Sequence, residues 1–287
     1  MYRYAFFMLA FALTLASCSK KEDVGPIRDP YPYLKATVDP GAVPAPEQRS
    51  AGSNPYHRYG RLHNQGFKDV ILSTNPSTTY KQLINIMGEY TGYPGMETFR
   101  EFTGLSGLPI EQQLDSAEAA GAGELARATW QFLAEELQAM DTPDFAAANA
   151  LFNATDAALL GFDPDERSGS LEHALGVSSI FRYSFALHTG ATFDGVDYSN
   201  QPWNPTPNLP PHPETGVYID WIQLIMADAM GFLAGFDWKK GLAASLSDLA
   251  DQLIGGTWTL SEVFYPEIGA TAPFSPDAAG SGVMPDR

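Results

Sequence analysis

Apolar side chains recur at three- and four-residue spacing along most of the chain, which is typical of helices that bury one face. This pattern fills seven stretches: 55–73, 77–91, 123–141, 144–161, 169–189, 217–235 and 238–254. Boundary signals agree with it, because Pro76 can open a helix, Gly92 can close it, and Thr142 followed by Pro143 resembles an N-cap. Strand-like alternation is scarce. The sequence therefore predicts an all-α fold, a helical bundle with long irregular connections.

Three stretches lack this periodicity. Residues 19–53 are rich in proline, glycine and charge, which indicates a flexible tether. Residues 190–215 hold six prolines interleaved with aromatic side chains, and we expect a long irregular connection there. Residues 257–287 form a second irregular stretch, which we expect to be a tail.

The beginning of the chain resembles a secretion signal. Arg3 precedes about a dozen apolar residues, the length of a signal core and too short for a comfortable transmembrane helix, which needs roughly 20. The tetrapeptide LASC at 15–18 resembles the lipobox of bacterial lipoproteins, in which the cysteine is lipidated and becomes the first mature residue. The alternative is a short apolar helix that ends in a chance cysteine. We expect a signal peptide at 1–17, a lipidated N-terminus and tether at 18–53, a helical domain at 54–256 and a tail at 257–287.

Lipidation of Cys18 would anchor the protein to a membrane, which is the one partner that the sequence predicts. Cys18 is the only cysteine, so an internal disulfide is excluded, and an acylated cysteine is no nucleophile. The following residue, Ser19, is not the aspartate that typically retains lipoproteins in the inner membrane. We therefore expect the bacterial cell envelope, with the outer membrane favoured over the inner one.

The charge is strongly acidic, with 17 basic and 34 acidic residues and a net charge of −17. Removing Arg3 with the signal makes the mature chain one unit more negative. Nucleic-acid binding is excluded because it depends on lysine and arginine side chains that neutralise phosphates. A protein or glycan partner stays open.

The most distinctive stretch is NPYHRYGRLHNQGF at 54–67. It resembles the N-terminal segment of a family of uncharacterised bacterial lipoproteins, with the pattern Asn-Pro-Tyr-acid-x-x-Gly-x-x-His-Asn-x-Gly-Leu. The chain departs from this pattern at His57, where an acid is usual, and at Phe67, where leucine is usual. Weaker likeness runs through 179–184 and 227–231. The resemblance implies a helical lipoprotein domain and brings no established activity, substrate or catalytic residue.

The motif also has a direct physical interpretation. Asn54 can cap a helix that starts at Pro55. Tyr56, Gly60, His63 and Asn64 then share one face, where Gly60 is tolerable if another backbone or ring approaches closely. Buried His63 and Asn64 need hydrogen-bond partners. One interpretation is a polar site with His63 as general base or metal ligand; the other, which we favour, is a core histidine and an asparagine that clamps a loop.

Other chemistry has little support in the sequence. The histidines lack metal-binding spacing, and zincin, EF-hand, serine-hydrolase, P-loop and Rossmann motifs are missing, so we expect no metal and no cofactor. Ala227, Gly231 and Gly235 follow each other at four-residue spacing, which predicts a tight helical hairpin. A membrane-inserting hairpin is the alternative, although Asp220 and Asp228 oppose it.

Three functions remain open from the sequence alone. The favoured one is a membrane-anchored envelope lipoprotein with an interaction or structural role and no enzymatic activity. The second is an envelope hydrolase that uses a polar site around His63. The third is a membrane-active C-terminal helical hairpin. A sealed His63 would favour the first, and a deep pocket with a second titratable group would favour the second.

Overall fold

The computed structural model describes residues 29–38, 54–75, 77–102, 105, 108–140, 144–162, 169–199, 201 and 220–254. Within these ranges lie ten helices and one two-stranded hairpin: α2 (Pro30–Thr37), α3 (His57–Leu72), α4 (Tyr80–Thr91), α5 (Gly95–Phe102), α6 (Ile110–Ala119), α7 (Glu124–Gln138), α8 (Phe145–Gly161), α9 (Gly169–Thr189), β1 (Thr192–Phe193), β2 (Val196–Asp197), α10 (Trp221–Gly235) and α11 (Trp238–Ile254). The predicted all-α bundle is confirmed.

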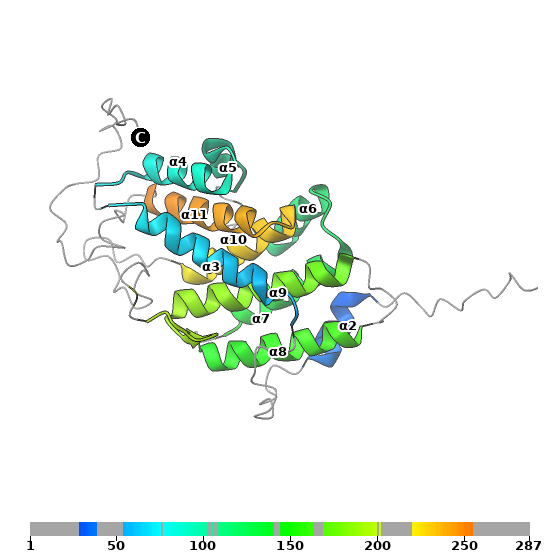
Figure 1. Cartoon of the computed structure of the whole chain (residues 1–287). Helices are drawn as coiled ribbons and strands as arrows, with labels where there is room; N and C mark the ends of the chain where they lie inside the picture. Colours follow the sequence, from blue (N-terminus) through cyan, green and yellow to red (C-terminus); the bar gives the residue numbers. More distant parts are fainter. Residues whose placement is uncertain are drawn as a thin grey trace, which may run out of the picture.

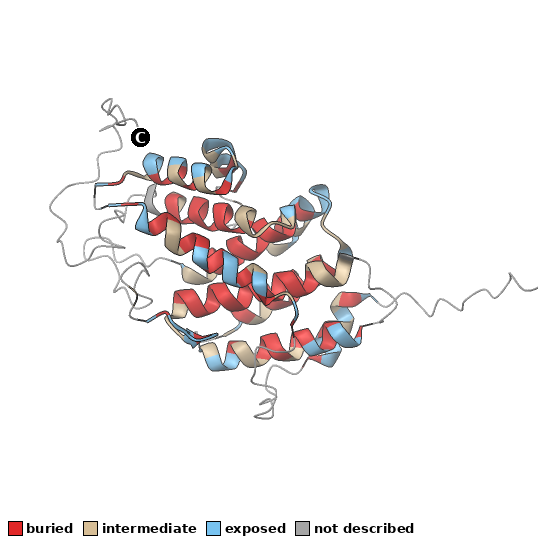
Figure 2. Cartoon of the chain, viewed as in Figure 1, coloured by how far each residue is buried: buried red, intermediate tan, exposed pale blue. Residues whose placement is uncertain are grey.

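Helix α9 is the centre of the bundle (Figure 1). It packs against α3, α7, α8 and α10, while α11 lies along α10 and carries α4 and α5 on its other side. Residues 174–188 of α9 are all buried, as the continuous red of Figure 2 shows. A helix that is enclosed on every side must satisfy any polar side chain it carries from inside the protein.

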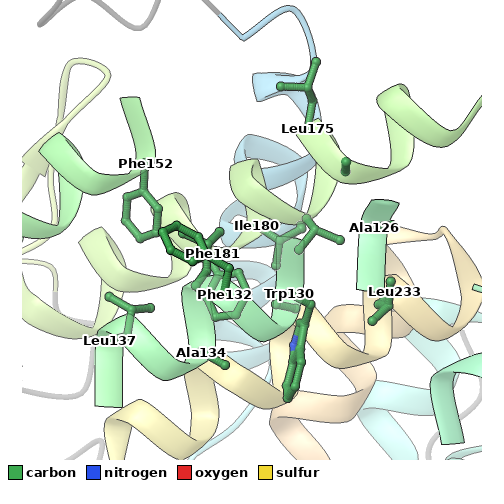
Figure 3. Close-up of a cluster of buried hydrophobic side chains, with 14 of the residues drawn as sticks. Ala126, Trp130, Phe132, Ala134, Leu137, Phe152, Leu175, Ile180, Phe181 and Leu233 are labelled. Atoms are coloured by element: carbon green, nitrogen blue, oxygen red, sulfur yellow. The ribbon is translucent and has the colours of Figure 1, made fainter. Parts of the chain in front are cut away.

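The larger hydrophobic cluster joins α7, α8, α9 and α10 (Figure 3). Trp130 and Phe132 of α7 are almost completely buried against Phe181 of α9 and Phe152 of α8. Burying a side chain of this size contributes about 1.5–3 kcal/mol relative to exposure. A second cluster joins α3, α4 and α11 through Phe67, Leu83 and Leu246, among others. These two clusters fix α3, α9 and α10 around a common interior.

Helices α10 and α11 form the tight hairpin that the small-residue spacing predicts. A methyl group on Gly231 would lie 2.6 Å from the Ala244 Cβ and 2.6 Å from the backbone oxygen of Lys240. A methyl group on Gly241 would lie 2.7 Å from the backbone oxygen of Asp228. Such contacts allow only glycine, so the two backbones approach as closely as the sequence indicates.

All seven expected helices are present, with shifted ends. Helix α4 starts later than expected, where Thr79 and Gln82 form a reciprocal capping box, and Gly92 ends it in a left-handed conformation as predicted. Helix α8 is capped by Asp144, which accepts a hydrogen bond from the Ala146 amide, while the predicted cap Thr142 lies outside the described residues. The short helices α5 and α6 were not predicted, because neither is long enough to show a clear period.

The predicted tether is wrong for residues 29–38. Here the Asp29 side chain caps α2 with Pro30 in its first turn, and Leu34 is fully buried in the larger cluster. Lys35 forms ion pairs with Glu135 and Glu136 of α7. The sequence does not predict this helix, because two of its eight residues are prolines and it is too short to show an apolar period. The rest of the predicted tether, the signal peptide with Cys18 and the tail at 257–287 lie outside the described residues.

The expected irregular connection after residue 190 begins with a hairpin of β1 and β2. Asp194 and Gly195 both have positive φ, of 51° and 78°, which is the backbone of a type I′ turn. Residues 202–219 of that connection lie outside the described part. Among the described helices, none is both long enough and apolar enough to cross a membrane.

Candidate functional site

The stretches 54–67, 179–184 and 227–231 meet inside the protein. The first lies on α3 and the loop before it, the second on α9 and the third on α10, and both α3 and α10 pack against α9. Polar side chains from these stretches, together with Asp156 of α8 and His188 of α9, form two buried clusters, which we name the His63 cluster and the Arg182 cluster. Both lie among side chains that are almost wholly inaccessible to solvent.

The His63 cluster consists of His63, Asn64, Ser184, His188 and Asp228. His63 Nε2 lies 2.7 Å from Asp228 Oδ1, and its Nδ1 lies 3.1 Å from Asn64 Oδ1. The orientation of the Asn64 amide is fixed, because its nitrogen donates to the backbone oxygen of Tyr183 at 2.8 Å. Both ring nitrogens of His63 therefore face acceptors. With Asp228 ionised, a proton on each ring nitrogen satisfies both contacts, which is the arrangement of a buried imidazolium paired with the Asp228 carboxylate.

The second oxygen of Asp228 faces α9. The Ser184 hydroxyl donates to Oδ2, and His188 Nε2 lies 3.7 Å from the same atom, beyond hydrogen-bonding distance. The His188 ring stacks on Trp221 at 5.2 Å and meets Phe67 edge-on at 5.7 Å. Asp228 is thus the hub to which α3 and α9 attach through side chains.

The pKa values of the pair reflect this arrangement. Burial alone lowers the pKa of His63, but the Asp228 charge and the hydrogen bonds that His63 donates to Asp228 and Asn64 outweigh it, so the pKa is raised. Burial alone raises the pKa of Asp228, but the His63 charge, the nearby His188 ring and the hydrogen bond from His63 lower it to about 2. Both shifts stabilise the charged pair at neutral pH.

The Arg182 cluster joins the start of α3 to α8 and α9. Arg182 Nη2 donates to Asp156 Oδ2 at 2.7 Å, and the amide of Asn54 donates both to Asp156 Oδ1 at 3.1 Å and to the backbone oxygen of Leu175 at 2.9 Å. Arg182 Nη1 lies 3.3 Å from His57 Nε2. The side chains of Arg182 and Asp156 are 1% and 0% exposed, so the ion pair is fully removed from water.

Burial dominates the pKa values of this second pair. It raises the pKa of Asp156 in spite of the nearby Arg182 charge, and it lowers the pKa of Arg182 in spite of Asp156. Arg182 Nε is buried and has no hydrogen-bond partner among the described residues. The Arg182–Asp156 pair therefore holds its charges at a net cost in free energy that the His63–Asp228 pair avoids.

The predicted motif residues fall into two groups. His63 and Asn64 lie in one cluster and Asn54 in the other, whereas Tyr56 is half-buried and stacks on Tyr59 at 6.1 Å. Asn54 does not cap α3, which begins at His57; its Oδ1 instead accepts from the Tyr56 amide at 2.8 Å. At Gly60 the close approach is confirmed, since a methyl group there would lie 2.4 Å from the Tyr183 ring.

The arrangement differs from a nucleophilic triad in one respect. A triad places the histidine between serine and aspartate, so that the imidazole takes the serine proton. Here Asp228 lies between Ser184 and His63, and His63 has no free nitrogen lone pair. In the part of the chain that the structure describes, no three His, Cys, Asp or Glu side chains are grouped to hold a metal. What the cluster can do is bind three helices together.

Sequence reasoning did not find the partners of the motif. In the sequence, Asp228 argues only against membrane insertion. No spacing marks Ser184, Asp156, Arg182 or His188 as a partner of His63 or Asn54. The available signal was a charged residue within a helix that is otherwise apolar on all faces, as Asp228 is in α10 and Arg182 is in α9. Which of these residues pair with one another depends on helix packing, which the sequence does not display.

Comparison of the chain with protein-family models, with curated proteins and with solved structures finds no match.

Proposed function

We propose that the protein is a lipid-anchored lipoprotein of the bacterial cell envelope whose helical domain has an interaction or structural role. The observation that carries the domain's part of the proposal is the pairing of both His63 nitrogens with acceptors. A histidine in this state has no basic nitrogen to offer, and its ring is sealed from solvent. The most distinctive residues of the chain thus support the fold.

The anchor part of the proposal rests on the sequence. Arg3, the short apolar run and the LASC tetrapeptide agree on a lipidated Cys18. Two or more acyl chains give stable membrane attachment, at about 0.8 kcal/mol for each buried methylene group. Such a protein presents an acidic, folded domain to the space beside the membrane.

The anchor is tested by metabolic labelling with a radioactive or clickable fatty acid. We expect label on the wild-type chain, none on Cys18→Ala, and a shift of Cys18→Ala from the membrane fraction to the soluble fraction or to an uncleaved precursor. Label retained by Cys18→Ala would overturn the anchor.

The role of the domain is tested by the variant His63→Gln, with His173→Gln as the matched control outside both clusters. If His63 supports the fold, His63→Gln lowers the unfolding midpoint and the amount of protein in the envelope, and His173→Gln changes neither by much. Any cellular phenotype should then follow the amount of folded protein. A His63→Gln protein that is as stable and abundant as wild type, yet fails to complement a deletion, would overturn the proposal in favour of the hydrolase.

A further inference from the structure

A cavity of about 300 Å³ lies between the end of α7 and the start of α10. This volume is at the lower end of the range of small-molecule sites, which is about 300–1,000 Å³. Leu137, Gln138 and Met140 line it from α7 and the residues that follow that helix. Gln138 is exposed and lies at the mouth, whereas Leu137 is buried, so the cavity reaches from the surface to the edge of the larger hydrophobic cluster.

The wall formed by α10 and its cap combines two apolar side chains with the polar side chains of Asp220 and Gln223. Ile222 and Met226 line it, and Met226 is almost fully buried. Gln138 Nε2 lies 3.2 Å from Met226 Sδ, so the two helices meet across the cavity through an amide and a thioether. A methionine side chain is unbranched and polarisable, so it can adapt its conformation to a small apolar group in the cavity.

The mouth is electrically negative. The C-terminus of α7 faces it, and the last turn of that helix carries no basic residue to offset its partial negative charge. Asp220 adds a full negative charge at the rim, where it is exposed. The N-terminus of α10 would contribute a partial positive charge here, but Asp220 already caps it. Asp220 Oδ1 accepts a hydrogen bond from the Gln223 backbone amide at 2.9 Å.

We infer that this cavity is a binding site for a small organic cation, an ammonium group on a short alkyl body. The alkyl part would lie against Leu137, Ile222 and Met226, and the ammonium group would lie at the mouth between Asp220 and the final carbonyl groups of α7. An anion would meet repulsion at the same place. The inference concerns a site separate from both buried clusters, and it does not depend on the proposed function.

The test uses the full chain with its methionine methyl groups labelled with carbon-13. n-Butylammonium is titrated while the methyl resonances of Met140 and Met226 are followed, with n-butanol and butyrate as neutral and anionic probes of similar shape. We expect a dissociation constant on the order of 1 mM for butylammonium, which corresponds to about −4 kcal/mol. Both control probes should shift these two resonances much less at equal concentration.

Two variants locate the binding. Asp220→Asn removes the charge but keeps a good N-cap residue, so α10 should still form. We expect it to weaken butylammonium binding about three- to ten-fold, whereas the same change at the cap of α8, Asp144→Asn, should leave it unchanged. Ile222→Trp should fill the cavity and abolish the shifts.

Several results would overturn the inference. Equal shifts by butanol and butylammonium would mean an apolar cavity without charge preference. Equal weakening by Asp220→Asn and Asp144→Asn would mean a general effect of the acidic surface. Absence of shifts at Met140 and Met226 up to roughly ten times the expected constant would mean that the cavity does not bind this class of ligand.

Discussion

The two buried clusters hold the same kind of interaction, an ion pair without access to water, yet they satisfy it differently. In the His63 cluster, Ser184 and Asn64 complete the hydrogen bonding of the Asp228 carboxylate and the His63 ring, and the nitrogens left unsatisfied within the described part of the chain are those of the adjacent His188 ring, outside the ion pair itself. In the Arg182 cluster, one nitrogen of the guanidinium has no partner among the described residues. A buried ion pair stabilises a fold only when its remaining donors and acceptors are also met.

The pKa directions express this difference. Asp228 is held more acidic than an ordinary aspartate, whereas Asp156 is held less acidic. In the first cluster the neighbours outweigh the cost of burial, and in the second they do not. We therefore expect the His63–Asp228 pair to contribute stability at neutral pH. The Arg182 cluster should fix the position of the loop before α3 and lower the free energy of unfolding in doing so.

The largest effect is expected when the carboxylate of the His63 cluster loses its charge. Asp228→Asn leaves the His63 ring without its counter-ion and places an amide against Ser184, and we expect a loss of about 3–5 kcal/mol in unfolding free energy. Urea denaturation followed by circular dichroism measures it. The control is Asp220→Asn at the exposed cap of α10, which should change stability by less than about 0.5 kcal/mol. A loss below about 1 kcal/mol at Asp228 would contradict a charged, well-satisfied pair.

A smaller effect is expected at the amide that orients His63. Asn64→Ala removes the acceptor of Nδ1 and the donor to the Tyr183 backbone oxygen, both of which are buried. We expect a loss of about 1–3 kcal/mol with an unchanged slope in denaturant. Gln65, the next residue along α3, is exposed, and Gln65→Ala serves as control. Equal stability of Asn64→Ala and wild type would mean that the Asn64 amide does not hold the His63 ring.

Most of the fold could be predicted from the sequence, because the long helices are marked by recurring apolar residues and by proline and glycine at their ends. The failures have physical causes. Helix α2 presents one fully buried leucine, Leu34, which gives no period over eight residues. The β-hairpin had a signal, Asp194 followed by Gly195, but its strands are two residues each, too short to show alternation.

The candidate site could be predicted only in part. The face that carries His63 and Asn64 was placed inside, and the structure confirms their burial. Their partners on α9 and α10 could not be assigned, because many polar side chains could meet an inward histidine until the packing of the helices is known. Gly60 and Gly231 did predict two helix contacts, because each marks a place where another element approaches the helix backbone closely.

The acid dependence of stability should separate the two clusters. Asp228 has a pKa of about 2 against an ordinary value of 3.8, so its contribution is complete above about pH 5 and falls by about 2 kcal/mol as the pH drops to 2. The stability advantage of wild type over Asp228→Asn should therefore shrink on acidification. It should also shrink on the alkaline side, because the raised pKa of His63 means that its contribution is lost as the pH rises through that value.

The Arg182 cluster should show the opposite sign in acid. The pKa of Asp156 is raised, so protonation is easier in the folded than in the unfolded protein, and the wild type should gain relative to Asp156→Asn as the pH falls. Unfolding midpoints in urea are measured at a series of pH values from about 2 to 8. The difference between wild type and Asp228→Asn, and that between wild type and Asp156→Asn, are then each plotted against pH. Two curves of the same sign would contradict the contrast between the clusters.

The smallest net effect is expected when both charges of the Arg182 cluster are replaced together. Asp156→Leu or Arg182→Met alone strands a buried charge and should cost about 3–5 kcal/mol, but the double variant removes both charges and fills similar space. The Asn54 amide keeps the Leu175 backbone oxygen as its acceptor, so the loop before α3 stays attached. We expect the double variant to lie within about 1 kcal/mol of wild type in urea denaturation, or above it.

The matched double variant, His63→Leu with Asp228→Leu, should behave differently. It leaves the Ser184 hydroxyl and the Asn64 carbonyl buried without partners, and each such group costs about 1–3 kcal/mol. Restoring apolar packing therefore cannot compensate here as it can in the Arg182 cluster, and we expect a clear loss of stability. If instead both double variants were as stable as wild type, Ser184 and Asn64 would contribute nothing to the His63 cluster. If both were strongly destabilised, the unpartnered nitrogen of Arg182 would carry no cost, and the two ion pairs would be equivalent in spite of their different surroundings.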